Sequence, residues 1–343
     1  IDKIPSIEMV KFAKNGSNVT TAAIKLARAF TNKQYIAIPK QHPFFSFDDW
    51  FISKTPITKG TQIGSEKYTL FFDYNDIDSL KTLFEQYKDN IAGVMLEPAT
   101  SLVPYPYSDD DMKYLPLLAK KNNNFLKDVR KICTQNKSLL ILDEMITGFR
   151  WDNLGASHYF DVQPDLITFG KAMANGFSLS ALGGKNEIME LGSISKEGEE
   201  RVFLLSTTHG AEMNSLGAFI ETLKIYENEP VVEHLWRYGK DLKFKVNEIS
   251  KSLGLDKHFF FYGPAIALNY ITKNENQEIC LKFRTLFSQE MVKNNILMPY
   301  VSLSYSHKNR ELRKTLLAIE NSLLVYKKAL EEGVDNYLNS DVI

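Results

Sequence analysis

A lysine and an aspartate each stand at the end of a short apolar segment, and their positions differ by 171 − 143 = 28 residues. Asp143 follows residues 139–142 directly, and Lys171 follows residues 166–169 and one glycine. Short segments that are apolar on both faces are typical of buried parallel strands. Reactive groups of α/β proteins collect at the carboxyl ends of such strands. We therefore expect Asp143 and Lys171 at the carboxyl edge of one sheet.

This pair of residue types has a defined chemical use. A lysine that is desolvated at a strand end has a lowered pKa and can form a Schiff base with a carbonyl group. A carboxylate beside a pyridinium nitrogen keeps that nitrogen protonated, so that a pyridoxal phosphate (PLP) ring can accept electrons. Taken alone, the two residues are more simply explained as a turn-capping aspartate and a surface lysine, because most charged residues lie at the surface.

The residues around the pair change this interpretation. The relevant letters, in chain order, are Asp143-Glu144, Thr147-Gly148-Phe149-Arg150, Gly155-Ala156, Pro164-Asp165-Leu166, Gly170-Lys171-Ala172 and Asn175-Gly176. This series resembles the signature of the class III, fold type I, PLP-dependent aminotransferases, and most of all glutamate-1-semialdehyde 2,1-aminomutase and its relatives. A match of this length is far more specific than one short motif. The resemblance implies that Lys171 binds PLP covalently and that Asp143 holds the pyridinium nitrogen.

A glycine-containing turn near the N-terminus is a candidate phosphate site. Residues 9–30 read as a strand, a turn and a helix, and free N–H groups at a helix N-terminus attract an anion. By composition alone the segment is only a turn. The resemblance places the phosphate loop of the family here, which implies that Gly16 and Ser17 bind the phosphate. Asn18 stands where the family usually has an acidic residue.

Two further positions are assigned to the cofactor by the resemblance. Phe44 aligns with an aromatic residue that lies against the cofactor ring, although Phe45 and Ser46 replace the His-Gly that follows it in the family. The alternative is that these aromatic residues only pack in the core. Glu97 follows the apolar segment 91–96 and matches a Glu-Pro pair of the family. Its alternative is an exposed carboxylate at a strand end.

Residues 206–210, Ser-Thr-Thr-His-Gly, resemble the stretch whose threonine reaches the cofactor phosphate of the neighbouring subunit. We assign this role to Thr208, with Thr207 in reserve. The alternative is a polar turn that caps the next helix. The assignment predicts a homodimer, because a monomer could not complete its own site.

Periodicity elsewhere in the chain predicts the elements that position these residues. Further strands are expected at 9–13, 35–38, 91–96, 181–184 and 266–270, and helices at 77–87, 125–136, 213–226 and about 312–330. Asp76 is the expected N-cap of the helix that begins at residue 77. We predict an α/β fold with a large PLP-binding domain over 1–227, built on a mostly parallel sheet flanked by helices. A smaller C-terminal α+β domain is predicted over 228–343.

Composition excludes several other classes. Of the 343 residues, 44% are hydrophobic and 24% charged, which is ordinary for a globular protein. Lys and Arg number 41 against 42 Asp and Glu, so net charge does not favour binding to nucleic acid or to an anionic membrane. Two cysteines cannot build a disulfide framework, and no metal site is expected. Reduced thiols are the default in a cytosolic protein, so we expect a cytoplasmic location. We see no signal peptide and no apolar run of ~20 residues.

The sequence thus predicts PLP-dependent transfer of an amino group on a small molecule, with pyridoxamine 5'-phosphate as the alternate form of the cofactor. The resemblance favours conversion of glutamate-1-semialdehyde to 5-aminolevulinate. The altered positions 45 and 46 keep open an intermolecular aminotransferase that acts on a sugar or small-metabolite carbonyl, because motifs fix a cofactor better than a substrate. Family members carry several tens of residues before the first strand of this chain, so we expect a fragment or a shortened member. That expectation motivates a third alternative, a catalytically silent interaction protein.

Overall fold

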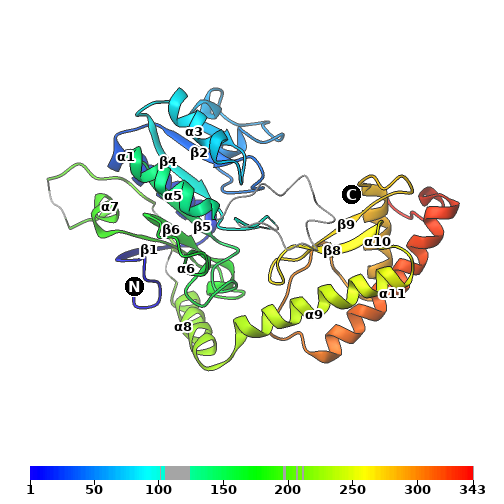
Figure 1. The fold of residues 1–343 in the computed structure, drawn as a ribbon. Helices are drawn as coiled ribbons and strands as arrows, with labels where there is room; N and C mark the ends of the chain where they lie inside the picture. Colours follow the sequence, from blue (N-terminus) through cyan, green and yellow to red (C-terminus); the bar gives the residue numbers. More distant parts are fainter. Residues whose placement is uncertain (101, 105–123, 196–197, 206–207, 211, 343) are drawn as a thin grey trace. The chain divides into compact units, whose positions relative to one another are not determined.

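The computed structural model describes residues 1–343 except 101, 105–123, 196–197, 206–207, 211 and 343 (Figure 1). The described residues divide into two compact units. Those up to Glu229 form the first unit, and those from Pro230 onward form the second. No helix among the described residues is both long and apolar enough to span a membrane.

The described part of the first unit contains a seven-stranded sheet with the order β1-β7-β6-β5-β4-β2-β3. Its strands are β1 (Met9–Ala13), β2 (Tyr35–Pro39), β3 (Thr69–Phe72), β4 (Ile91–Leu96), β5 (Leu139–Glu144), β6 (Leu166–Phe169) and β7 (Ser180–Gly184). Strand β7 is antiparallel to both of its neighbours, and the other pairs are parallel. The predicted α/β fold with a mostly parallel sheet is therefore confirmed.

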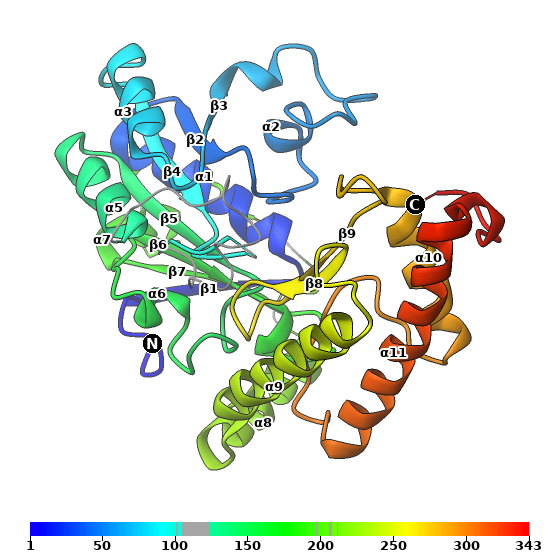
Figure 2. The same cartoon turned by 45° about the vertical axis from the view of Figure 1, so that its right-hand side comes forward.

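Helices cover both faces of this sheet. The described helices of the first unit are α1 (Gly16–Thr31), α2 (Asp49–Ile52), α3 (Ile77–Gln86), α5 (Phe125–Gln135), α6 (Ala156–Tyr159), α7 (Asn186–Met189) and α8 (Met213–Asn228), of which α1, α3, α5 and α7 contact its strands. Figure 2 shows α1 on one side of the sheet and α3 and α5 on the other. Leu139 and Ile141 pack in the core cluster that contains the inner face of α1. Because side chains alternate along a strand, Leu140 and Leu142 face the α5 side, which explains the unbroken apolar run.

A side-chain cap begins α3, as the sequence predicts, and another begins α1. Asp76 is the N-cap of α3, and its carboxylate accepts the N–H of Ser79 at 3.2 Å. Asn15 is the N-cap of α1, and its side chain accepts the N–H of Asn18 at 3.2 Å. Each cap satisfies an N–H group that the helix itself leaves free. The start of α1 is thereby fixed directly after β1.

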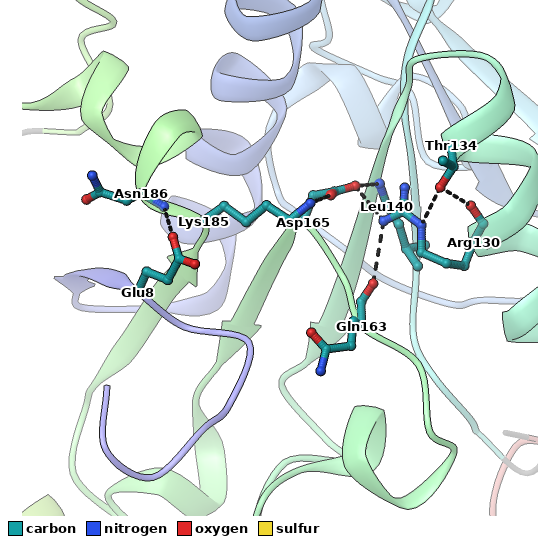
Figure 3. A network of polar contacts seen from close by, with 8 residues as sticks. All are labelled: Glu8, Arg130, Thr134, Leu140, Gln163, Asp165, Lys185 and Asn186. Atoms are coloured by element: carbon teal, nitrogen blue, oxygen red, sulfur yellow. Dashed lines mark hydrogen bonds and ion pairs between the residues drawn. The ribbon is translucent and has the colours of Figure 1, made fainter.

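A buried carboxylate ties the amino-terminal ends of the central strands together (Figure 3). Asp165 precedes β6 and accepts the N–H of Leu140 in β5 at 2.8 Å. One of its oxygens lies 2.6 Å from Nη1 of Arg130 in α5, and the other lies 2.6 Å from Nζ of Lys185, which follows β7. One side chain thus joins three strands and a helix at the edge of the sheet opposite the carboxyl end of β5.

The second unit consists of α9 (Val231–Ser252), α10 (Leu281–Lys293) and α11 (Asn309–Glu332) around a hairpin of β8 (Phe259–Tyr262) and β9 (Asn269–Thr272). The strand expected at 266–270 is wrong in its position. The N–H of Ala267 bonds the carbonyl of Pro264 at 2.9 Å, so this stretch forms the turn of the hairpin and the strand begins later. Phe259 and Phe261 of β8 and Tyr270 of β9 pack in the core of this unit.

Candidate active site

A pocket of about 420 Å³ in the first unit gathers most of the predicted site residues. Six of the seven line it, namely Gly16, Ser17, Phe44, Glu97, Asp143 and Lys171. Thr208 does not line it and is exposed. Thr207, the reserve for Thr208, lies outside the described residues. A cavity of similar volume in the second unit, about 410 Å³, contains none of these residues.

Asp143 is held at the end of β5 by two hydrogen bonds. It pairs in register with Thr168 of β6. Its Oδ1 accepts the hydroxyl of Thr168 at 2.9 Å and the N–H of Met145 at 3.0 Å. Burial raises the pKa of Asp143 to about 6, and the two hydrogen bonds act in the opposite direction. Both bonds reach the same oxygen, so the carboxylate is fixed while Oδ2 is left to face the pocket.

Lys171 follows β6 and begins a short 3-10 turn, Lys171–Met173. Its φ of 41° lies in the left-handed region, which residues other than glycine seldom adopt and which is often found at functional positions. Its side chain is exposed. The desolvation expected of this lysine is therefore not found in this chain.

Met145 packs between the lysine turn and the start of α1. A Cβ atom on Gly170 would lie 2.5 Å from the Met145 sulfur, and one on Gly16 would lie 3.0 Å from it. The first distance is shorter than any real contact, so residue 170 has to be a glycine for the thioether to lie there. The Met145 side chain thus explains why the residue before Lys171 is a glycine.

The amino end of α1 forms an electropositive wall of the pocket. Its first turn has no acidic residue, so no charge within that turn offsets the helix dipole. Ser17 is buried, and its hydroxyl accepts the N–H of Phe47 at 3.1 Å, which leaves its proton free to be donated. Lys14 also lines the pocket and pairs with Glu212, with 2.9 Å between nitrogen and oxygen. These groups suit an anion.

Three phenylalanines of the aromatic segment line the pocket and differ in their burial. Phe45 is buried, and its ring packs against Phe51 with centroids 5.7 Å apart. Phe44 is 53% exposed and Phe47 is 58% exposed, and both line the pocket. Phe45 therefore packs in the core as the alternative expects and also lines the pocket, whereas Phe44 lines it with an exposed ring. Ser46 is buried and accepts the N–H of Asp48 at 3.1 Å.

Glu97 follows β4 and is only 3% exposed, so the alternative of an exposed strand-end carboxylate is wrong. Its Oε2 has no hydrogen-bond partner among the described residues. Burial raises the pKa of Glu97 to about 8, the charge of Asp143 adds to that rise, and Lys171 opposes it. At neutral pH Glu97 therefore holds its proton more firmly than Asp143 does.

Several residues that line the pocket were not predicted from the sequence, among them Lys14, Met145, Phe177, Ser178 and Leu179. Met145 directly follows the two carboxylates of the signature, and the last three directly follow Asn175-Gly176. Their nearness to the signature was the available signal. The four uncharged side chains carry no chemical cue of their own, and Lys14 stands outside the signature, so none of the five was recognised.

Comparison with known proteins decides the family. The model of the family described as "Aminotransferase class-III" matches residues 1–286. This chain belongs to the class III aminotransferase family. The resemblance seen in the signature is therefore confirmed.

Individual relatives of this class III aminotransferase differ in their named activities. The chain is 32% identical to the 3-aminobutyryl-CoA aminotransferase of Cloacimonas acidaminovorans, covering 95% of this chain and 73% of that protein. It is 31% identical to the glutamate-1-semialdehyde 2,1-aminomutase of Alkaliphilus oremlandii, covering 95% and 76%. The chain is about equally similar to these two relatives, whose named activities differ, so the comparison does not identify its substrate.

Solved structures show the same fold. The FumI protein of Sphingopyxis sp. MTA144, solved in its PLP internal aldimine form, superposes with a TM-score of 0.80 at 25% identity, over 97% of this chain and 74% of that one. An omega-transaminase from Sphaerobacter thermophilus superposes with a TM-score of 0.75 at 22% identity, over 94% and 75%. The fold of this class III aminotransferase is thus fold type I. Membership of an enzyme family favours an enzyme over the silent interaction protein considered above.

Proposed function

We propose that this chain is a PLP-dependent enzyme that moves amino groups, with Lys171 as the residue that binds the cofactor covalently. One observation carries the proposal: the lysine and the carboxylate Asp143, which leave two adjacent parallel strands, line a single pocket. The class III family and the fold of the PLP-containing FumI protein support it.

The residues of the pocket fit this cofactor. Its volume of about 420 Å³ lies within the range of small-molecule sites. The N–H groups at the start of α1, together with the Ser17 hydroxyl, suit the phosphate. The fixed carboxylate of Asp143 suits a protonated ring nitrogen, and the exposed ring of Phe44 offers an aromatic face for stacking. An anion site, a carboxylate, an aromatic ring and an amine are the groups that PLP requires.

Each residue has a role in the chemistry. PLP, when bound, supplies an electron sink for a carbanion beside the transferred nitrogen. Asp143 holds the proton on the ring nitrogen, and its hydrogen bonds to Thr168 and Met145 keep Oδ1 from rotating away. Lys171 would hold the cofactor through its Nζ, and the same amine would serve as the base that moves the proton during the amino shift. Gly16 and Ser17 orient the phosphate and so the ring.

The finer activity is an intramolecular amino shift that converts glutamate-1-semialdehyde to 5-aminolevulinate. The signature and the relatives named as aminomutases support it. An intermolecular aminotransferase that acts on the carbonyl of a sugar or another small metabolite is the second candidate. The 3-aminobutyryl-CoA aminotransferase relative and the replaced residues Phe45 and Ser46 favour that candidate.

The enzyme acts as a homodimer in which Thr208 reaches the cofactor phosphate of the partner subunit. Two observations support this arrangement: Thr208 is exposed, and it lies outside the pocket of its own chain. A hydroxyl in this position needs a second copy of the chain to find a phosphate.

Cofactor binding tests the general proposal. Adding PLP should produce the absorbance band of a lysine-bound cofactor, and Lys171→Ala should abolish that band. Lys59→Ala, at an exposed lysine outside the pocket, is the control and should leave the band intact. A natural chain without a band, or a band that persists in Lys171→Ala, contradicts the proposal.

A substrate test separates the two candidate activities. Incubation of the PLP-loaded enzyme with glutamate-1-semialdehyde and no added amino donor should yield 5-aminolevulinate if the enzyme is a mutase. Product that forms only when an amino donor and a different carbonyl compound are supplied would replace the mutase by the intermolecular transferase.

A further inference from the structure

His42 is a buried histidine that lies behind the pocket and does not line it. Its side chain is 3% exposed. Its Nδ1 accepts the backbone N–H of Glu97 at 3.1 Å. A histidine in contact with the backbone of a pocket residue can act on the site only through that residue.

This hydrogen bond fixes the protonation state of the histidine. A backbone N–H can only donate, so Nδ1 of His42 has to be the unprotonated nitrogen and the ring proton lies on Nε2. A second proton, on Nδ1, would remove the acceptor. Burial lowers the pKa of His42 to about 3, which agrees with a ring that stays neutral. Nε2 is buried and has no hydrogen-bond partner among the described residues.

The bond stands where the backbone ladder of the sheet has ended. The last register pair between β2 and β4 is Ala37 with Val94, three residues before Glu97. His42 comes from the loop after β2 and supplies by its side chain the acceptor that the strand no longer supplies. The N–H of Glu97 is thereby satisfied at the point where the chain enters the pocket.

Tyr74 secures the next residue of the same segment. Its hydroxyl donates to the carbonyl of Pro98 at 2.7 Å, and its ring lies 4.9 Å from the ring of His42. The Glu97-Pro98 segment is thus held through its N–H by His42 and through its carbonyl by Tyr74. Two buried rings fix the backbone from which the Glu97 carboxyl projects.

We propose that His42 is a positioning residue of the amino-transfer site, which sets the place of the Glu97 carboxyl relative to Asp143 and Lys171. The proposal rests on the function proposed above. Glu97 lines the pocket with an unpartnered, buried Oε2, and the charged groups that act on it are Asp143 and Lys171. A displaced Glu97 would change the electrostatic environment of the lysine that binds the cofactor.

Two substitutions at position 42 form a matched pair. Asn places its Oδ1 where His carries Nδ1 and can accept the same N–H, whereas Leu has similar bulk and no acceptor. In the PLP-loaded enzyme, His42→Leu should shift the midpoint of the pH titration of the cofactor band by about half a unit or more. It should also lower kcat about tenfold with KM nearly unchanged, because a misplaced group acts on the reaction more than on binding. His42→Asn should have the same titration midpoint and kcat as the natural enzyme.

A second background tests whether the effect passes through Glu97. The double variant Glu97→Gln, His42→Leu should therefore have the same midpoint of the cofactor-band titration as Glu97→Gln alone. A midpoint and kcat in His42→Leu equal to those of the natural enzyme would overturn the proposal. Equal shifts in His42→Leu and His42→Asn would overturn the hydrogen bond as the cause.

A measurement on the natural chain covers the case in which the variants do not fold. ¹⁵N NMR of the histidine rings should find one neutral ring with its proton on Nε2 across pH 5 to about 9, and Glu97→Gln should leave that state unchanged. The opposite tautomer, or a ring that gains a second proton in this range, overturns the proposal. If the natural chain gives no cofactor band, the proposed function fails, whereas a normal band with an unaffected His42→Leu removes this inference alone.

Discussion

At the scale of single residues, the pocket keeps two carboxyl groups in different states. Asp143 accepts two hydrogen bonds that favour its charged form, whereas Oε2 of Glu97 has no partner among the described residues. Burial and the neighbouring charge raise the pKa of Glu97 to about 8, against about 6 for Asp143. Groups whose environments separate their pKa values in this way take different roles in acid–base chemistry.

The raised pKa of Glu97 makes a prediction about stability. Between its ordinary value of 4.5 and about 8, the folded chain holds the Glu97 proton and the unfolded chain does not. Unfolding then releases a proton, so the free energy of unfolding of the cofactor-free protein should fall as pH rises through this window, on the order of a few kcal/mol. Glu97→Gln should flatten this dependence in urea unfolding from pH 5 to about 9.

The control for that experiment is Glu187→Gln, which changes an exposed carboxylate and should leave the pH dependence as it is in the natural chain. A Glu97→Gln variant with an unchanged pH dependence would show that the carboxyl is not held in its neutral form.

Residues of the site could be predicted from sequence where they belong to a long motif. Lys171 and Asp143 stand within a series of matching letters, and the structure places both in the pocket. Lys14 and His42 could not be found this way. Lys14 stands in a loop that reads only as a turn, and the bond of His42 to Glu97 joins residues 55 positions apart. Nothing in the local sequence indicates such a contact.

At the scale of elements, the ends of the central strands are held by different means. The carboxyl ends border a pocket, while the amino-terminal ends are joined by Asp165, whose side chain is 5% exposed. It accepts from two cations and one N–H, so all of its charge is compensated. Removing one member of a buried ion pair leaves the other members uncompensated, which is costly.

Asp165→Asn should therefore lower the free energy of unfolding by about 3 kcal/mol, as measured by urea unfolding. Asp161→Asn is the matched control, because Asp161 pairs with Lys127 at the surface and exposed pairs contribute little. Equal stability of the two variants would contradict the structural importance given to Asp165.

Most strands of the first unit were predictable because they are short, mostly apolar runs bounded by polar residues, but β3 (Thr69–Phe72) was missed. The order of the strands was not predictable, since β1 pairs with β7, which lies about 170 residues later in the chain. The direction of β7 likewise has no local signal. In the second unit, the strand expected at 266–270 was misplaced because a turn that contains apolar residues looks like the start of a strand.

At the scale of the whole molecule, every predicted site residue except Thr208 lies in one pocket of the first unit. Thr208 is the residue on which the proposed homodimer depends. If it serves the phosphate of a partner subunit, each site of a homodimer contains residues from two chains, and two defective chains can complement one another.

Mixing two variants tests this arrangement. Thr208→Val should lower PLP affinity about fivefold through loss of one phosphate hydrogen bond, and Lys171→Ala should be inactive. In a mixed dimer, the chain with Thr208→Val keeps its own lysine and receives Thr208 from its partner. Activity at low PLP should therefore recover on mixing under conditions of subunit exchange. Thr58→Val, at another exposed threonine, should bind PLP normally.

The covalent attachment of the cofactor tests the central claim most directly. Borohydride reduction of the PLP-loaded protein, followed by peptide mass spectrometry, identifies the lysine that carries the cofactor. The account predicts that the mass of one phosphopyridoxyl group is found on Lys171. A label on another lysine of the pocket, such as Lys14, or a chain that carries no label, would contradict it.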